Sequence, residues 1–116
     1  MSERAMQEPT LLVLTALADR PRHGYAIIRE VSEISAGRVR LRTGTLYSAL
    51  ERLLTQGLIT IDREEVVDGR LRRTYGLAEP GRAALAAEAA RLTATAGEAI
   101  RRLGGLGGLG TKGVTA

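Results

Sequence analysis

The hydrophobic pattern of this chain changes period along its length, and this change constrains the fold more than any other sequence feature. Through most of residues 9–57 the apolar residues recur every three or four positions, which is typical of amphipathic helices. Residues 58–78 instead have a strand-like pattern around the turn-forming pair Asp68-Gly69. The helical spacing returns at residue 79. The sequence therefore predicts a mainly α protein with one small β-hairpin.

Three short helices are expected before the hairpin, at residues 9–19, 23–36 and 43–56. The first is nearly all apolar and should be buried on most sides, whereas each of the other two has one apolar and one polar face. Gly37 and Gly57 follow the second and third helices, where glycine is a common stop signal.

Two kinds of strand are expected. Residues 38–42 alternate strictly between arginine and an apolar residue, which favours a short half-buried strand with its three arginines on one side. In the hairpin, a three-residue loop at residues 67–69 with Gly69 in the left-handed region places the apolar residues of both strands on one face. The predicted pairs are Ile59 with Leu77, Ile61 with Tyr75 and Glu64 with Arg72.

The order helix, helix, short strand, helix, hairpin, long helix is that of a winged helix-turn-helix domain followed by a C-terminal helix. In that architecture the third helix lies in the major groove of DNA, and the hairpin, or wing, reaches toward the backbone or the minor groove. We therefore expect residues 1–78 to form a DNA-binding domain and residues 79–103 a dimerisation helix. Residues 104–116 are glycine-rich and are expected to form a flexible tail.

The distribution of charge agrees with a nucleic-acid-binding face. The chain has 17 basic and 13 acidic residues, a formal net charge of +4. Residues 20–52 contain seven arginines and three acids, so this segment alone accounts for the net charge. A local basic excess is typical of proteins that bind nucleic acid, although an ordinary arginine-rich solvated surface would have the same composition.

The residues expected to contact DNA come from the second and third helices, the segment between them and the wing. N-terminal residues of a recognition helix reach base edges and phosphates, and arginines neutralise phosphates. The candidates are Tyr25, Arg40, Arg42, Thr43, Gly44, Thr45, Tyr47, Ser48, Arg70, Arg72 and Arg73. Three have further interpretations: Gly44 would allow close approach or helix entry, Tyr47 could pack against the second helix, and Arg72 could be occupied by Glu64.

The last helix has an apolar seam whose members recur at alternating steps of three and four residues, as in coiled coils. They are Leu85, Ala89, Leu92, Ala96, Ile100 and Leu103. The seam is longer than a three-helix body can cover, so we expect it to form a homodimer that holds two recognition helices one DNA turn, ~34 Å, apart. Gly97 costs ~1 kcal/mol relative to Ala and could allow fraying beyond it.

Five short segments carry a further signal. They are Leu11-Leu12-Val13-Leu14, Pro21-Arg22-His23-Gly24-Tyr25, Thr43-Gly44-Thr45-Leu46-Tyr47, Gly57-Leu58-Ile59 and Arg73-Thr74-Tyr75-Gly76-Leu77. In this order, within residues 9–92, they resemble the PadR family of bacterial transcriptional regulators. The resemblance implies a winged-helix homodimer of the small form that binds a palindromic operator and usually represses transcription.

The resemblance also implies that a small, often aromatic, effector binds near the dimer interface and releases the DNA. Some relatives hold a planar ligand between Trp side chains of the last helix. This chain has no Trp, so that mode of ligand binding is not carried over.

Composition and motifs argue against an enzyme. The chain has no Cys and a single His, His23, which excludes thiolate chemistry and a histidine-based metal cluster, so neither a metal nor a cofactor is expected. No nucleotide-binding glycine loop or paired carboxylate is present, and no catalytic residue is predicted. His23 is expected to help start the second helix. No membrane span or signal peptide is recognised, which favours a cytoplasmic protein.

Two other functions are compatible with the sequence. One is a winged-helix protein-interaction module without DNA binding, for which the clustered arginines would be dispensable. The other is a small-molecule-binding dimer whose DNA function has lapsed. A salt series separates both from a DNA-binding regulator, because only binding to DNA weakens steeply as the salt concentration rises.

Overall fold

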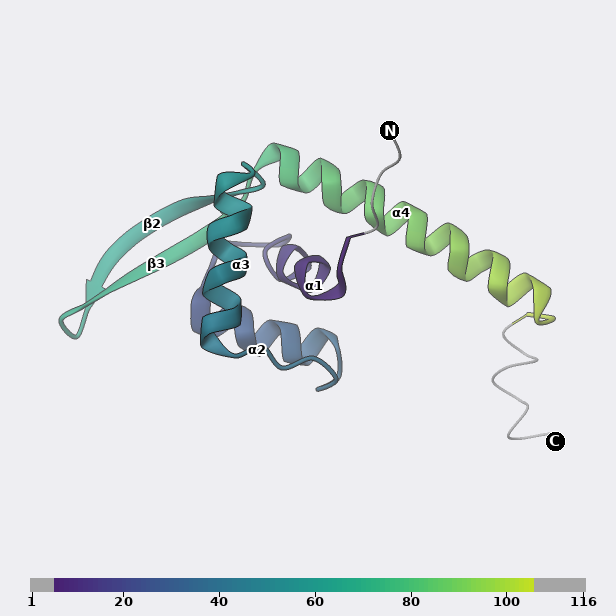
Figure 1. Cartoon of the computed structure of the whole chain (residues 1–116), viewed down its shortest axis with the longest axis horizontal. Coiled ribbons are helices and arrows are strands. Elements are labelled where there is room, and N and C mark those ends of the chain that lie inside the picture. The colour runs from purple at the N-terminus through teal and green to yellow at the C-terminus, as the bar shows by residue number, and fades with distance from the viewer. Residues whose placement is uncertain (1–5, 106–116) are drawn as a thin grey trace. The chain divides into compact units, whose positions relative to one another are not determined.

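In the computed structural model, which describes residues 6–105, four helices and three strands follow one another along the chain (Figure 1). They are α1 (Glu8–Ala16), β1 (Arg22–His23), α2 (Gly24–Ile34), α3 (Thr43–Thr55), β2 (Ile59–Val67), β3 (Arg70–Leu77) and α4 (Glu79–Arg102). The described residues fall into two compact units, one ending at Leu85 and the other beginning at Ala86. The predicted mainly α fold with a small antiparallel sheet is confirmed.

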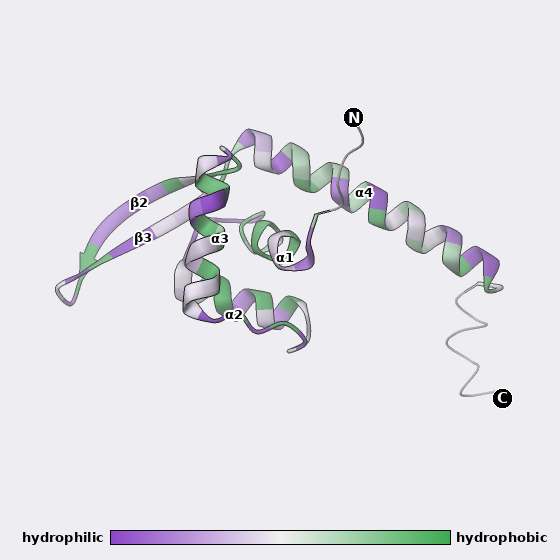
Figure 2. Ribbon diagram, in the orientation of Figure 1, coloured by the Kyte–Doolittle hydropathy of each residue, from purple (hydrophilic) through white to green (hydrophobic). Residues whose placement is uncertain are grey.

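The hydrophobic core of the first unit is built around α1. Leu12, Val13 and Leu14 of this helix are buried, as expected for a helix that is nearly all apolar. The buried residues that complete the core come from α2, α3 and the sheet: Ile27, Val31, Leu46, Leu50, Leu53, Ile59 and Tyr75. Figure 2 shows hydrophobic residues on all three short helices and mixed polarity along the two long strands. Burial of each large apolar side chain contributes about 1.5–3 kcal/mol, so this core fixes how α3 is presented.

Local hydrogen bonds determine where the first two helices begin and end. α1 ends at Ala16, earlier than predicted, and the Arg22 Nε–H donates to the Ala16 carbonyl oxygen at 2.7 Å. α2 begins after His23, whose Nδ1 accepts a hydrogen bond from the Ala26 N–H at 3.3 Å. Such an N-cap contributes about 1 kcal/mol. The predicted role of His23 in starting the second helix is confirmed.

The strand predicted at residues 38–42 is wrong, because these residues form a loop between α2 and α3. After α2 the chain reverses through Ala36 and Gly37, whose φ angles are 55° and 80°. The Ser35 hydroxyl oxygen then accepts a hydrogen bond from the Val39 N–H at 2.9 Å. The alternation in sequence has another cause: the two apolar residues pack against the core while the arginines stay exposed.

The third strand of the sheet is β1 instead, which no sequence pattern indicated because it has only two residues. Arg22 pairs with Tyr75 and His23 with Thr74, giving the strand order β1-β3-β2. This pairing ties the start of α2 to the base of the β2–β3 hairpin.

The β2–β3 hairpin, the wing, has the predicted pairs at its base and a different turn at its tip. Ile59 pairs with Leu77 and Ile61 with Tyr75, as predicted. The predicted three-residue loop is wrong, since Val67 pairs with Arg70 and leaves a two-residue turn. In this turn Asp68 has a φ of 53° and Gly69, left-handed as predicted, a φ of 76°. Positive φ at both positions is typical of the type I′ turn, whose twist matches that of the strands.

A β-bulge reconciles the two-residue turn with the pairing at the base. The register shifts between Ile61 and Arg63, so Asp62 is the extra residue on β2. Beyond the bulge, Glu64 pairs with Arg73 rather than with Arg72 as predicted. The bulge therefore brings the apolar residues of both strands to one face, as the predicted three-residue loop would also have done.

α4 is 24 residues long and is helical through Gly97 and on to Arg102, beyond the point where fraying was considered. Its first turn lies close to the residues that precede β2, because a Cβ on Gly81 would come within 2.0 Å of the Leu58 carbonyl oxygen. Of the predicted tail, residues 106–116 lie outside the described residues. Within residues 6–105, no helix is long and apolar enough to span a bilayer.

Candidate nucleic-acid interface

α3 has one apolar and one polar face. Leu46, Leu50 and Leu53 are buried in the core, which turns the opposite side of the helix toward solvent. This outward face of α3 consists of small or polar side chains at helical spacing. Its exposed members are Gly44, Thr45, Ser48, Glu51, Arg52 and Thr55. The predicted DNA contacts Thr43, Gly44, Thr45 and Ser48 are all exposed in the first two turns of this helix.

Two glycines near this face have different explanations. A Cβ on Gly24, at the start of α2, would lie 2.3 Å from the Tyr47 hydroxyl oxygen, so glycine there makes room for the Tyr47 side chain in its present position. A Cβ on Gly44 would have no neighbouring atom within 4 Å, and glycine inside a helix costs roughly 0.5–1 kcal/mol relative to Ala. The packing of this chain therefore does not explain Gly44, whereas close approach of a ligand would.

Tyr47 lies at the edge of the outward face. Its ring packs against the start of α2 at Gly24, which is the structural role considered for it. The residue nevertheless remains 43% exposed. Tyr47 thus holds α3 against α2 and still presents part of its ring to solvent.

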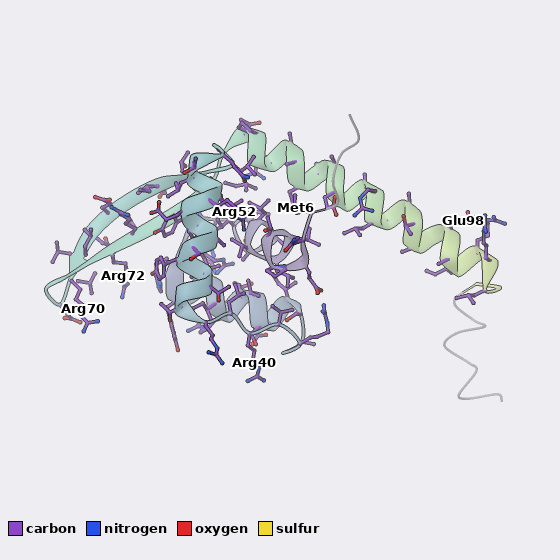
Figure 3. All side chains as sticks on the ribbon, in the orientation of Figure 1. Met6, Arg40, Arg52, Arg70, Arg72 and Glu98 are labelled. Atoms are coloured by element: carbon purple, nitrogen blue, oxygen red, sulfur yellow. The ribbon has the colours of Figure 1, made fainter. Side chains whose placement is uncertain are left out.

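The wing presents two arginines without an acidic partner. Arg70 and Arg72 are exposed near the tip (Figure 3) and form no ion pair with any residue in the described part of the chain. Arg73 differs, since its Nε–H donates to a carboxylate oxygen of Glu64 at 2.7 Å, and this bond raises the pKa of Arg73 above its ordinary value. The bulge therefore gives Glu64 a different arginine from the one expected and leaves Arg72 available.

The loop between α2 and α3 contributes further positive charge. Figure 3 shows Arg40 projecting from this loop; its Nε–H donates to the Gly37 carbonyl oxygen at 3.3 Å. Arg42 immediately precedes α3 and is exposed. Arg38 is instead neutralised by Glu8, with 2.6 Å between guanidinium nitrogen and carboxylate oxygen. Arg40 and Arg42 are therefore the available cations of this loop.

A cleft of about 550 Å³ separates the start of α2 from the distal half of the wing. It is lined by His23, Gly24, Tyr25, Tyr47, Val67, Asp68, Arg70, Leu71, Arg72 and Arg73. The structure thus brings five of the predicted contacts together around one cleft, whereas Arg40, Arg42 and the first residues of α3 do not line it. A helix N-terminus and several arginines favour an anion such as a phosphate.

His23 lies in this cleft in its neutral form. Burial lowers its pKa, and the positive charges of Arg72 and Arg29 lower it further. Because Nδ1 accepts the hydrogen bond from the Ala26 N–H, the remaining proton of the neutral ring is on Nε2, where it can be donated to an anion. Tyr25 beside it is 65% exposed, and the Arg29 guanidinium lies 5.9 Å from its ring centroid.

Three residues of the outward face of α3 were not predicted as contacts: Glu51, Arg52 and Thr55. Arg52 donates a hydrogen bond to the Thr10 hydroxyl oxygen at 3.3 Å and so also ties α3 to α1. The signal that could have found them is helical periodicity, since Glu51, Arg52 and Thr55 follow Ser48 at steps of three, four and seven.

The predicted dimerisation residues fall into two groups. Leu85 packs against the core of the first unit. Ala89, Leu92, Ala96 and Leu103 are exposed and Ile100 is half-buried. The apolar seam beyond Leu85 is therefore largely open to solvent in this single chain.

Within residues 6–105, no group of three or more acidic or histidine side chains is arranged to hold a metal ion. The arrangement of the first unit is that of a surface for a large anion: a helix with a small polar face, beside a cleft with arginines. Its chemistry is recognition, through hydrogen bonds and charge neutralisation.

Comparison with known proteins identifies the family. The model described as the transcriptional regulator PadR-like family matches residues 13–87. A curated relative, transcriptional regulator Rv3488 of Mycobacterium tuberculosis, is 38% identical over 90 residues, which cover 78% of this chain and 80% of that protein.

Solved structures show the same fold. A PadR family transcription regulator from Clostridium difficile R20291 is similar with a TM-score of 0.69 at 23% identity, over 85% of this chain and all (100%) of that one. Bacillus subtilis PadR in complex with operator DNA is similar with a TM-score of 0.61 at 21% identity, over 68% of this chain and 46% of that one. With the family match over most of the first unit, these comparisons show that the chain belongs to the PadR-like family of transcriptional regulators.

Proposed function

We propose that this protein is a homodimeric repressor that binds a palindromic operator in double-stranded DNA and is released by a small-molecule effector. The outward face of α3 would enter the major groove, and Arg70 and Arg72 of the wing would contact the backbone or the minor groove. The observation that carries the proposal is Gly44, a helical glycine that the packing of the chain does not require, at the start of a face flanked by unpaired arginines.

The remaining predicted contacts have distinct roles in this proposal. Thr43, Thr45 and Ser48 present hydroxyl groups to base edges and phosphates. Arg40 and Arg42, in the loop that precedes α3, neutralise phosphates at the edge of the major groove. Tyr25 and Tyr47 border the cleft in which a phosphate of the DNA backbone would lie. Arg73 is held by Glu64, so we assign it the stiffening of the wing as well as a share of the positive potential.

The dimer is supported by the exposed part of the apolar seam on α4. Leu92 is 39% and Leu103 61% exposed, and a coiled-coil spacing of apolar residues is matched by a second copy of the same helix. We therefore propose residues 1–78 as the DNA-binding domain and residues 79–103 as the dimerisation helix. Repression and release by an effector are supported by the family alone.

A fluorescence-anisotropy titration against duplexes from the protein's own promoter region tests the proposal. With a scrambled duplex in parallel at about 150 mM salt, we expect the promoter duplex to bind at least ~10³-fold more tightly. Arg70→Ala and Tyr47→Ala should weaken this binding, while Arg20→Ala, which removes an exposed arginine outside the wing and α3, should have little effect.

Equal, weak binding of both duplexes that neither substitution changes would contradict binding at this promoter. The alternative function, a protein-interaction module, has one observation in its favour: Val66 and Leu71 form an apolar cross-strand pair near the wing tip and are 70% and 59% exposed. Under that alternative, Leu71→Ser would abolish partner binding and Arg70→Ala would leave it unchanged.

A further inference from the structure

Glu51 is the acidic residue on the outward face of α3, which lies between the arginines of the α2–α3 loop and those of the wing. It shares the outward face of α3 with Gly44 and Ser48, at steps of seven and three residues, and its side chain is exposed. It also borders a recess toward the wing that Leu71 and Arg73 line. Its position is therefore among the groups that meet DNA if α3 enters the major groove.

No cation within residues 6–105 neutralises Glu51. The nearest arginine of the recess, Arg73, is held by Glu64 at 2.7 Å, and the ion pairs of the wing connect Glu64 with Arg73 and Glu65 with Arg63. A carboxylate that is unpaired within the protein repels phosphates and lowers affinity for every DNA sequence. A hydrogen-bond donor on the DNA would offset this cost at the sequences that carry it.

The chemistry of base edges limits what that partner can be. An ionised carboxylate only accepts hydrogen bonds. In the major groove guanine presents the acceptors N7 and O6, and thymine presents the acceptor O4 and a methyl group, so both are unfavourable partners. Cytosine presents the donor N4 amino group and adenine the donor N6 amino group, but adenine N6 lies beside the acceptor N7, which repels a carboxylate. Cytosine N4 is therefore the base edge that Glu and Asp side chains recognise.

We propose that Glu51 is a specificity-determining residue that accepts a hydrogen bond from the N4 amino group of a cytosine at one position of each operator half-site. This inference rests on the proposed function, because it requires α3 to lie in the major groove. Glu51 lowers the affinity for DNA in general but lowers it least for sequences that carry cytosine at that position. Its main effect is therefore on the discrimination between DNA sequences.

The test is a selection of randomised duplexes by the full-length protein, the Glu51→Gln variant and a matched control, Glu33→Gln. Glu33 is exposed on α2, off the outward face of α3, and its substitution removes the same charge. We expect the wild-type motif to contain one cytosine per half-site, preferred at least ~10-fold over guanine and thymine. In Glu51→Gln this preference should disappear or move to adenine, which Gln recognises through N6 and N7, while the other positions stay unchanged.

Three outcomes are distinguishable. A change confined to one symmetric position in Glu51→Gln, absent from Glu33→Gln, supports the inference. A uniform gain in affinity for all duplexes, or an unchanged motif, would overturn it, because the carboxylate would then act only by repulsion or not at all, and the proposed function would stand. Failure of the wild-type protein to select any motif would overturn the proposed function and this inference with it. Circular dichroism of each variant checks that α3 is retained.

Discussion

The two compact units of this chain differ in how much of their apolar side-chain surface is buried. The first unit buries most of its leucines and isoleucines within one chain, and nine of its large side chains are fully buried. In the second unit, which begins at Ala86, Leu92 and Ala96 of the apolar seam are exposed. The first unit therefore has a buried core in one chain, whereas the second leaves most of its apolar seam open to solvent. Substitutions in the first unit should therefore change the stability of the fold, whereas substitutions in the seam of α4 should change assembly.

The largest effect is expected from a charge in the seam of α4. Leu92→Glu should convert a dimer of about twice 12.4 kDa into a monomer, because it places an unpaired carboxylate in an apolar contact. Loss of the second half-site contact should weaken operator binding by ~10²–10⁴-fold, while the first unit stays folded. Sedimentation and anisotropy measure the two effects.

The matched control for this substitution is Ala94→Glu, which adds the same charge to an exposed position of α4 outside the seam. It should leave both mass and affinity unchanged. A wild-type protein that sediments as a monomer at operator-binding concentrations would show that the seam has another use.

A substitution in the core of the first unit should lower the stability of the fold and leave the dimer intact. Leu50→Ala removes a fully buried side chain of α3 and should reduce the free energy of unfolding by about 2–5 kcal/mol. Chemical denaturation followed by circular dichroism measures this loss. Under native conditions the Leu50→Ala dimer should persist, and dissociation of this core variant while its first unit is still folded would remove the distinction between the units.

Substitution of Gly44 should change the stability of the first unit and its affinity for DNA in opposite directions. Gly44→Ala should raise the free energy of unfolding by at most about 1 kcal/mol, because it removes a glycine from the first turn of α3 without creating a clash. It should also lower affinity for the operator, by about 10-fold or more, because its methyl group would occupy space at the DNA surface. Denaturation and anisotropy on the same sample test both signs.

Gly24→Ala is the contrasting variant, since its Cβ would lie 2.3 Å from the Tyr47 hydroxyl oxygen and should destabilise the fold. If Gly44→Ala bound the operator as tightly as the wild type, close approach of DNA would not be the reason for this glycine.

The smallest effect is expected from protonation of His23. Its pKa is lowered in the folded protein, first by burial, relative to about 6.5 in the unfolded chain, so the unfolded state binds more protons. Stability from the His23 cap is thus present above that value and is lost as the pH falls through the folded pKa. The loss should reach at most about 1 kcal/mol.

His23→Asn keeps an N-cap acceptor without a titrating ring and should flatten this dependence between pH 7 and 5. Denaturation curves across that interval compare the two proteins. The same slope in both would assign the pH dependence to groups other than His23.

Most of the fold could be predicted from the sequence because each helix has its own apolar period and stop signal. The predicted pairs at the base of the wing were also correct, because burial of Ile59 and Tyr75 selects that register however the turn is made. The turn itself was wrong, since a bulge at Asp62 and a three-residue loop satisfy the same constraint. The sequence pattern does not distinguish them.

Of the candidate site, sequence placed the exposed start of α3 and the arginines of the wing correctly on the surface. It could not predict which arginine Glu64 holds, because that depends on the one-residue shift at the bulge. The sequence also could not show that Gly24 and Gly44 have different structural roles. Only the position of Tyr47 shows that a side chain packs against the first glycine and none against the second.

The most direct test of the central claim, that α3 and the wing bind DNA, is the salt dependence of operator binding in Arg70→Ala/Arg72→Ala compared with the wild type. Each arginine that contacts a phosphate contributes about 0.9 to the slope of log affinity against log salt concentration. The account predicts weaker binding and a slope reduced by about 1.8 in the double variant. An unchanged slope and affinity would contradict it, because the unpaired arginines of the wing would then take no part in binding DNA.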